Sequence, residues 1–408
     1  MLIISNPASG SRKGPKIIED YVIPLLHKHN THFTLNTTNA PGHAGELAKE
    51  YLVSLGDTKS AIILVSGGDG TIHEIVNRLY ADLASSEPQL PTGPELQLIL
   101  LNTGTANALF HSLYPLVAGP EVQEFARKAL PTADISTINQ LQSLVAYLRG
   151  ENNMHPLTLG RNATYKQDGT IKESLLSLVV ASTALHANLL HTSEDLRDSM
   201  PGVERFTEAA KRNLDKWSYA KVYLNPASEG PVTIYDPSSD SFVECTSGRL
   251  AIDGPFSYFL STLNVDRLES GFIVTPLATR IKPKYNTMEV VVVRPLRSPQ
   301  ITDDSAQSRQ QFAGILMGSM GAARTAAHLN IRYSKDNTSQ VSPSEQGDGP
   351  TVVEYYRCSG WEWVPEDNSG DAAYMCVDGV ILEVEAGGRA SSECIAALPD
   401  SRGIKVFV

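Results

Sequence analysis

The segment Ser66-Gly67-Gly68-Asp69-Gly70-Thr71 connects an apolar run, 61–65, to a stretch with helical spacing of apolar residues, 72–84. Three glycines in four positions permit unusual backbone angles and let a ligand approach the main chain closely. Asp69 stands among them, where its carboxylate can accept a proton from an attacking hydroxyl or orient that hydroxyl. The alternative is a tight turn in which Asp69 caps the following helix. Taken alone, the segment indicates a phosphate-facing loop with a positioned carboxylate.

Strand and helix signals alternate on both sides of this loop through the first third of the chain. The expected strands are 2–5, 31–35, 61–65 and 96–101, and the expected helices are 17–26, 45–55 and 72–84. The run 61–65 is continuously apolar, as is typical of a buried parallel strand. The alternation predicts an open α/β domain with a mainly parallel sheet, covering residues 1–135.

After about residue 136 the pattern changes to short strands separated by turn residues. The expected strands are 174–183, 219–224, 232–235, 258–263, 289–293 and 380–384, with one helix around 203–214. This pattern predicts a second domain, 136–408, made of antiparallel β-structure in a sandwich-like arrangement. Two polar segments, 298–311 and 334–351, are expected to be flexible loops.

The composition excludes some classes of function. The chain has 408 residues, a net charge of −11 and a pI near 5.4, so two domains are expected and a nucleic-acid partner is not. The four cysteines form no C-x-x-C pair, which favours a reducing compartment. No secretory signal or membrane-spanning stretch is apparent, so we expect a cytoplasmic protein. The sequence does not indicate an oligomeric state.

Two further turns follow predicted strands at the same edge of the sheet. The first is Asn6-Pro7-Ala8-Ser9-Gly10-Ser11-Arg12-Lys13-Gly14, and the second is Leu101–Ala108, in which Thr105 and Asn107 offer short polar groups. Small residues let backbone N–H groups approach a phosphate, and a following helix N-terminus favours its negative charge. Either turn alone could be an ordinary connection or a helix cap. Three such turns at one edge favour a ligand site.

These turns resemble the catalytic domain shared by diacylglycerol kinases, sphingosine kinases and ceramide kinases. The matching motifs are Asn6-Pro7 with Gly10 for N-P-x-x-G, Gly67–Thr71 followed by His73-Glu74-Ile75-Val76-Asn77 for G-G-D-G-T and H-E-V-V-N, and Gly104-Thr105-Ala106-Asn107-Ala108 for G-[ST]-x-N-x-[LA]. Thr37-Thr38 also resembles a family segment near the nucleotide. The resemblance is specific over residues 1–115.

A weaker resemblance to the same family continues on the C-terminal side of residue 115. Residues 182–197 align without gaps with a sphingosine-kinase stretch, in which two family aspartates are replaced here by Asn188 and Leu190. In the same comparison Arg197 and Arg205 match family arginines that contact ATP phosphates. Val377-Asp378-Gly379 resembles the family V-D-G-E, whose glutamate is replaced by Val380.

The resemblance implies an ATP-dependent lipid kinase with its active site in the cleft between the two domains. The implied nucleotide-binding residues are Asn6, Pro7, Ser9, Gly10, Thr37, Gly67, Gly68, Gly70, Thr71, Gly104, Thr105, Asn107, Arg197 and Arg205. Asp69 is expected to act on the acceptor hydroxyl. Mg²⁺ is expected to bridge the ATP phosphates, with no protein ligand assigned. The acceptor is expected to be a lipid alcohol (a sphingoid base, ceramide or diacylglycerol-like lipid) bound near Leu185, Asn188 and Leu190, with peripheral membrane contact.

Two other functions remain open at this stage. A lipid- or nucleotide-binding pseudokinase is favoured by Leu190 and Val380, because neither side chain can replace a carboxylate. An NAD-kinase-like enzyme shares G-G-D-G-T. Its next signature, N-x-G-x-x-G-F, differs from the run 103–107, so the lipid branch is preferred.

Overall fold

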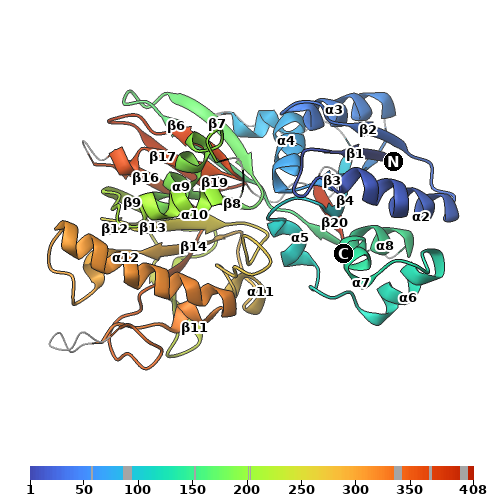
Figure 1. Ribbon diagram of the computed structural model, residues 1–408. Helices are drawn as coiled ribbons and strands as arrows, with labels where there is room; N and C mark the ends of the chain where they lie inside the picture. The colour runs from blue at the N-terminus through green and yellow to red at the C-terminus, as the bar shows by residue number, and fades with distance from the viewer. Residues whose placement is uncertain are drawn as a thin grey trace. The chain divides into compact units, whose positions relative to one another are not determined.

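The computed structural model describes residues 1–56, 58–85, 94–150, 153–200, 202, 204–334, 342–366, 370–395 and 403–408. The chain divides into two compact units (Figure 1). Unit 1 comprises Met1–Leu159, Arg267–Ser270 and Ile395–Val408, and unit 2 comprises Gly160–Asp266 and Gly271–Cys394. None of the described helices combines the length and the apolar character needed to cross a bilayer.

Unit 1 is a six-stranded sheet with helices on its faces. Its strands are β1 (Leu2–Ser5), β2 (Thr34–Thr37), β3 (Ser60–Gly67), β4 (Glu95–Asn102), β5 (Met154–Pro156) and β20 (Ile404–Phe407). Its helices are α1 (Gly14–Ile17), α2 (Ile23–Lys28), α3 (His43–Leu55), α4 (Asp69–Leu79), α5 (Ala108–Leu113), α6 (Pro120–Ala129), α7 (Ile135–Gln140) and α8 (Gln142–Leu148), with a π-helical turn at Ile18–Val22 and a 3₁₀ turn at Ala81–Ala84. The strand order is β2-β1-β3-β4-β20-β5, and only the β20–β5 pair is antiparallel.

The apolar residues of the strands explain this layering. Ile3, Leu64 and Ile99 share one buried cluster with side chains of α1, α2, α6, α7 and α8. Neighbouring residues of each strand point to the opposite face, where α3 contacts β1 and β3, and α4 contacts β3. A Cβ on Gly45 would lie 2.7 Å from the carbonyl oxygen of Glu74, so this glycine allows α3 and α4 to approach closely.

Unit 1 differs from the expected domain 1–135 in its limits. Helix α8 lies beyond residue 135, and its Leu144 and Val145 are completely buried in the unit 1 core. Strand β20 comes from the far end of the chain and inserts between β4 and β5. The local pattern of the sequence could not reveal the pairing of β20 with β4, because this pairing joins residues about 300 positions apart. Strand β2 also starts at Thr34, later than the expected start at residue 31.

Unit 2 is built on two antiparallel sheets. Its strands are β6 (Gly160–Tyr165), β7 (Ile171–Ser177), β8 (Val180–Thr183), β9 (Ala220–Asn225), β10 (Val232–Asp236), β11 (Ser241–Thr246), β12 (Leu250–Asp253), β13 (Tyr258–Thr262), β14 (Met288–Val293), β15 (Glu354–Cys358), β16 (Gly360–Pro365), β17 (Tyr374–Val377), β18 (Val380–Glu383) and β19 (Arg389–Cys394). Its helices are α9 (Ala184–Asp195), α10 (Glu204–Asn213), α11 (Leu277–Arg280) and α12 (Ala306–Gly321), with 3₁₀ turns at Pro295–Arg297, Ala322–Thr325, Ala327–Asn330 and Gly370–Ala372. The sheet orders are β11-β10-β15-β14-β13-β8-β17-β18 and β12-β9-β16-β19-β6-β7.

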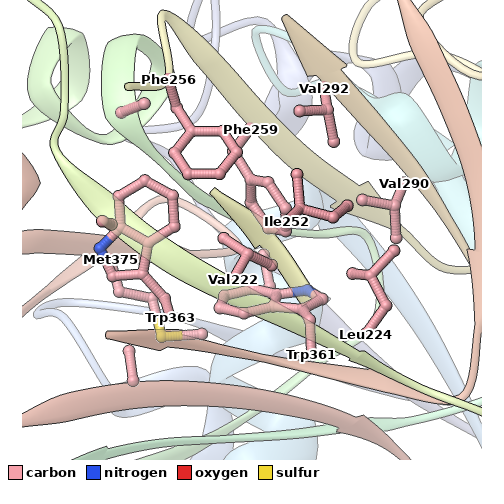
Figure 2. Packing of buried hydrophobic residues seen from close by; sticks show 14 of the residues in the cluster. Val222, Leu224, Ile252, Phe256, Phe259, Val290, Val292, Trp361, Trp363 and Met375 are labelled. Atoms are coloured by element: carbon pink, nitrogen blue, oxygen red, sulfur yellow. The ribbon is translucent and has the colours of Figure 1, made fainter. Parts of the chain in front are cut away.

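The two sheets pack face to face around an aromatic core (Figure 2). Trp361 and Trp363 of β16 meet Phe259 of the other sheet, with ring centroids 5.1 and 5.6 Å apart. Each indole N–H is satisfied, because Trp361 donates to the Ser261 hydroxyl and Trp363 donates to a backbone carbonyl. Buried tryptophans with satisfied N–H groups are stabilising. The predicted antiparallel, sandwich-like arrangement is therefore present.

The expected loop 298–311 is partly wrong. Residues 306–311 form the first turns of α12, which begins at an N-cap whose Ser305 hydroxyl accepts from the Ser308 amide. Phe312 and Leu316 lie buried one turn apart, and the ring of Phe312 packs against that of Trp217 with centroids 6.2 Å apart. Of the second expected loop, 334–351, residues 335–341 lie outside the described residues; 342–351 form turns and short bridges.

Candidate functional site

The three motif loops begin at one edge of the unit 1 sheet. Ser5 at the end of β1 pairs with Thr37 of β2 and with Ser66 of β3, and Gly67 pairs with Asn102 of β4. Because all four strands are parallel, their carboxyl ends lie together. The structure thus brings together the segments 6–14, 67–71 and 103–108.

Glycines form the contact between these loops. A Cβ on Gly104 would lie 2.3 Å from the Cα of Gly68, and a Cβ on Gly10 would lie 2.4 Å from the carbonyl oxygen of Thr103. Gly10 also has a φ of +52°, which favours glycine. Main chain therefore packs directly on main chain here, and larger residues at Gly10 or Gly104 would push the loops apart.

Side-chain hydrogen bonds fix the same arrangement. Asn6 donates from Nδ2 to the Thr71 hydroxyl at 3.1 Å, linking the first loop to the second. Asn107 accepts from the Gly104 amide at 2.9 Å and donates to the Gly104 carbonyl at 2.8 Å. Asn107 is buried with a φ of +52°, so its side chain stabilises a left-handed backbone conformation. Asn6, Thr71 and Asn107 therefore shape the loops as well as being expected to face the nucleotide.

Asp69 lies at the start of α4, and its carboxylate points to the next loop. It accepts from the amides of Ala108 and Leu109 at 2.8 and 3.1 Å. These amides belong to the first turn of α5, where N–H groups lack intrahelical partners. Asp69 thus caps α5, whereas the N-cap position of its own helix, which the alternative interpretation gave to Asp69, is occupied by Gly68. The two bonds hold the carboxylate in one orientation.

Gly70 stands apart from the other glycines of its loop. It is exposed, and a Cβ added to it would meet no atom within 4 Å. A small hollow opens beside it, lined by Val65, Gly67, Gly68, Asp69, Ile72, Leu100, Leu101, Asn107 and Phe110. The surface next to Asp69 is therefore formed mainly by backbone and apolar groups.

The remaining expected residues of unit 1 surround this centre. Pro7 and Ser9 are half-buried in the first loop. Thr37 is exposed at the end of β2, and Thr105 is exposed within the third loop. Among the described residues, no group of three or more His, Cys, Asp and Glu side chains is arranged to hold a metal ion.

The other expected site residues belong to unit 2. Arg197 is exposed after α9 and pairs with Glu194 at 2.6 Å. Arg205 lies in α10 with its guanidinium 4.4 Å from the Phe206 ring centre, and it donates to the Gly202 carbonyl.

The three lipid-side residues lie along α9. Leu185 and Asn188 are buried, whereas Leu190 is half-buried. Asn188 donates to the Asp371 carbonyl at 2.8 Å, and its own Oδ1 is buried with no hydrogen-bond partner among the residues that the structure describes. A buried amide oxygen of this kind favours a ligand donor or a water.

The motif Val377-Asp378-Gly379 has a clear local role. The Asp378 carboxylate accepts from the three consecutive amides of residues 178–180 at 2.7–3.0 Å. These bonds fix the turn between β7 and β8. Val380 is 41% exposed at the start of β18.

Sequence reasoning missed Thr103 and His111. The Thr103 hydroxyl lies 3.2 Å from the Ser66 hydroxyl, and this contact links the third loop to the residue that precedes the glycines of the second loop. In α5, Nε2 of His111 lies 3.5 Å from the side-chain nitrogen Nδ2 of Asn102. Burial lowers the pKa of His111, with a smaller contribution from the charge of Arg267. Thr103 sits inside the recognised motif and could have been found there. Arg267 lies 156 positions from His111 in sequence, so no local signal relates them.

Comparison with known proteins supports the family resemblance that the loop motifs predict. Residues 1–138 match the diacylglycerol kinase catalytic domain, which confirms the expected resemblance for this part of the chain. Human sphingosine kinase 1 is 33% identical over 113 residues, which are 28% of this chain and 27% of that protein. The mitochondrial acylglycerol kinase of Xenopus laevis is 30% identical over 114 residues, 28% of this chain and 24% of that protein. The aligned part spans about a quarter of these relatives' length.

A solved structure of a putative diacylglycerol kinase from Bacillus anthracis str. Sterne aligns over 99% of this chain and 93% of its own, with 11% identity and a TM-score of 0.49.

Proposed function

We propose that this chain, whose residues 1–138 match the diacylglycerol kinase catalytic domain, is a lipid kinase that transfers the γ-phosphoryl group of ATP to a lipid hydroxyl. The relatives named above, a sphingosine kinase and an acylglycerol kinase, support a lipid alcohol as the acceptor. The observation that carries the proposal is the set of three glycine-bearing loops packed together beside an oriented carboxylate.

The chemistry of these loops fits a polyphosphate. Gly67 and Gly68 place backbone beside the hollow without intervening side chains, and the amino end of α4 starts there. Helix N-termini and exposed amides favour phosphate groups. ATP supplies the phosphoryl group when it is bound. Mg²⁺ commonly binds through phosphates and waters with few carboxylates, so we assign it no protein ligand.

Asp69 is the proposed positioning group for the acceptor hydroxyl. Phosphoryl transfer depends mainly on alignment and charge stabilisation. A carboxylate held by the Ala108 and Leu109 amides changes orientation little, which supports a role in aligning the acceptor hydroxyl. Arg197 and Arg205 are proposed to add positive charge to the phosphates. For Arg197 this requires exchange of its exposed Glu194 partner, which costs little.

The acceptor is proposed to be recognised by the α9 region of unit 2. Leu185 and Leu190 are apolar, and the Oδ1 of Asn188, which has no partner within the described part of the chain, can accept from a hydroxyl or amide of the lipid. Neither Asn188 nor Leu190 carries the charge that would pair with an ammonium. We therefore expect ceramide- or diacylglycerol-like alcohols to be better acceptors than sphingoid bases.

The first test is transfer of label from ATP, with Mg²⁺, to a panel of lipid alcohols in detergent. We expect one lipid to be labelled. The variant Gly70→Ala should fold normally, because its Cβ meets no protein atom, yet it should lower ATP affinity about tenfold or more by crowding the phosphates. Gly314→Ala, also at an open position in a helix, is the matched control and should bind ATP normally.

Two results would contradict the proposal. ATP binding without transfer to any lipid favours the pseudokinase. Unchanged ATP affinity in Gly70→Ala shows that the loop does not hold the nucleotide.

A further inference from the structure

Two segments of unit 2 lack acidic residues altogether. The chain as a whole has 45 Asp and Glu against 34 Lys and Arg, yet residues 271–288 and 305–334 contain none of the former. Acid-free segments on a protein with a net charge of −11 reduce repulsion from other anions locally.

The two segments contact each other in the fold. The Ile273 amide donates to the Ala323 carbonyl at 3.0 Å, and His328 donates from Nε2 to the Val274 carbonyl at 2.9 Å. Figure 1 shows α11, in the first segment, near the carboxyl-terminal end of α12, in the second. The side chains of both segments can therefore contribute to one surface.

Helix α12 contributes an uncharged face to this surface. Its buried side turns Phe312, Leu316 and Met320 inward. Its exposed side carries Met317, whose side chain is 59% exposed, together with Gly314, Gly318 and Gly321. A Cβ on any of these three glycines would meet no atom within 4 Å, so no described part of the chain covers this face.

The same two acid-free segments carry cations. Lys282, Lys284 and Arg324 are exposed, and none of them has an ion-pair partner in the part of the chain that the structure describes. The neighbouring Arg280, by contrast, pairs with Asp240 at 2.5 Å. Three cations are thus available for an external anion.

We infer that the surface formed by Lys282, Lys284, Met317, Gly318 and Arg324 docks onto an anionic lipid bilayer. An uncharged helix face can enter the headgroup boundary while neighbouring cations contact anionic lipids. Each such cation contributes about 1 kcal/mol near an anionic membrane. In a symmetric pair of chains the same patch of each copy would face the other, so cation would meet cation; charge complementarity therefore favours an anionic bilayer over a symmetric dimer. The inference goes beyond the proposed reaction, because docking needs neither nucleotide nor transfer.

Flotation of the full chain with vesicles, without nucleotide, tests the inference. We expect binding to phosphatidylcholine vesicles that contain phosphatidylserine, weak binding to phosphatidylcholine alone, and a decrease with added salt. The double variant Lys282→Gln/Lys284→Gln should reduce partitioning about 30-fold, from about 1 kcal/mol per cation. The matched control Lys49→Gln/Lys166→Gln, at exposed lysines elsewhere, should bind like the unmodified chain.

A second pair of variants tests the apolar part. Met317→Glu should reduce vesicle binding at least tenfold, an order-of-magnitude expectation for a carboxylate at the interface, whereas Val53→Glu, at an apolar side chain exposed in α3, should not. Binding that none of the variants alters overturns the inference, as does absence of binding to anionic vesicles. If Met317→Glu only converts a dimer to a monomer in gel filtration, the face is a protein interface instead. Activity on lipid dispersed in detergent is measured separately, so loss of docking is distinguishable from loss of catalysis.

Discussion

At the residue scale, Asp69 combines two functions that mutation will affect together. Its carboxylate satisfies two amides at the start of α5, besides its proposed role toward the acceptor. Asparagine has one acceptor oxygen, so its NH₂ group would face one of these amides. We expect Asp69→Asn to lower the free energy of unfolding of unit 1 by about 1–3 kcal/mol, the cost of an unsatisfied donor.

Denaturant unfolding of Asp69→Asn checks this expectation. Asp82→Asn, at an exposed carboxylate of the same unit, is the control and should change stability little. Unchanged stability in Asp69→Asn would show that the α5 cap is energetically unimportant. Loss of transfer in this variant supports the proposed role only when it is measured on the folded fraction.

At the element scale, the 3₁₀ turn Ala327–Asn330 after α12 depends on a neutral histidine. His328 is completely buried, and its burial lowers its pKa to about 4, although the bond to the Val274 carbonyl acts in the opposite direction. The unfolded chain binds a proton near pH 6.5 that the folded chain binds only near pH 4. This group therefore contributes stability above pH 6.5, and that stability is lost as the pH falls toward 4.

His328→Gln should remove part of this acid sensitivity. We expect the fall in unfolding free energy between pH 6.5 and 4 to become smaller by roughly 2–4 kcal/mol, from the size of the shift. Thermal or denaturant unfolding at several pH values measures it, with the exposed His32→Gln as the control. Parallel pH profiles for His328→Gln and the unmodified chain would refute the assignment.

At the scale of the whole molecule, unit 1 is assembled from distant parts of the chain. Phe407 of β20 packs against Tyr147, and its carbonyl accepts from the hydroxyls of Tyr114 and Ser143. Lys405 of the same strand pairs with Glu95 at 2.7 Å. Residues 403–408 are therefore part of the sheet that carries the candidate nucleotide loops.

Phe407→Ala should destabilise unit 1 by about 3–5 kcal/mol, the usual cost of deleting a buried aromatic side chain. We expect weaker ATP binding at temperatures where unit 1 begins to unfold. Val53→Ala, which truncates a side chain that is 74% exposed, should change neither property. A normal unfolding transition in Phe407→Ala would indicate that β20 contributes little to the unit.

Much of the framework was predictable because it depends on local pattern. The strands β1, β3 and β4 and helices α3 and α4 follow from apolar periodicity and lie within a few residues of their predicted limits. The loops 6–14, 67–71 and 103–108 were recognised because glycine has a special backbone role, and parallel strand order implies a shared edge. Helix α12 was missed altogether, since its first turns are polar and its cap is a single serine.

The sequence by itself determined the fold class, the three glycine-bearing loops and the resemblance to the diacylglycerol kinase catalytic domain, because each resides in a few adjacent residues. Only the tertiary structure decided that Asp69 caps α5, that β20 completes the first sheet, and that two acid-free segments meet at α12. These features join residues 39 to about 300 positions apart. Such contacts arise from chain packing, and no local periodicity or motif encodes them.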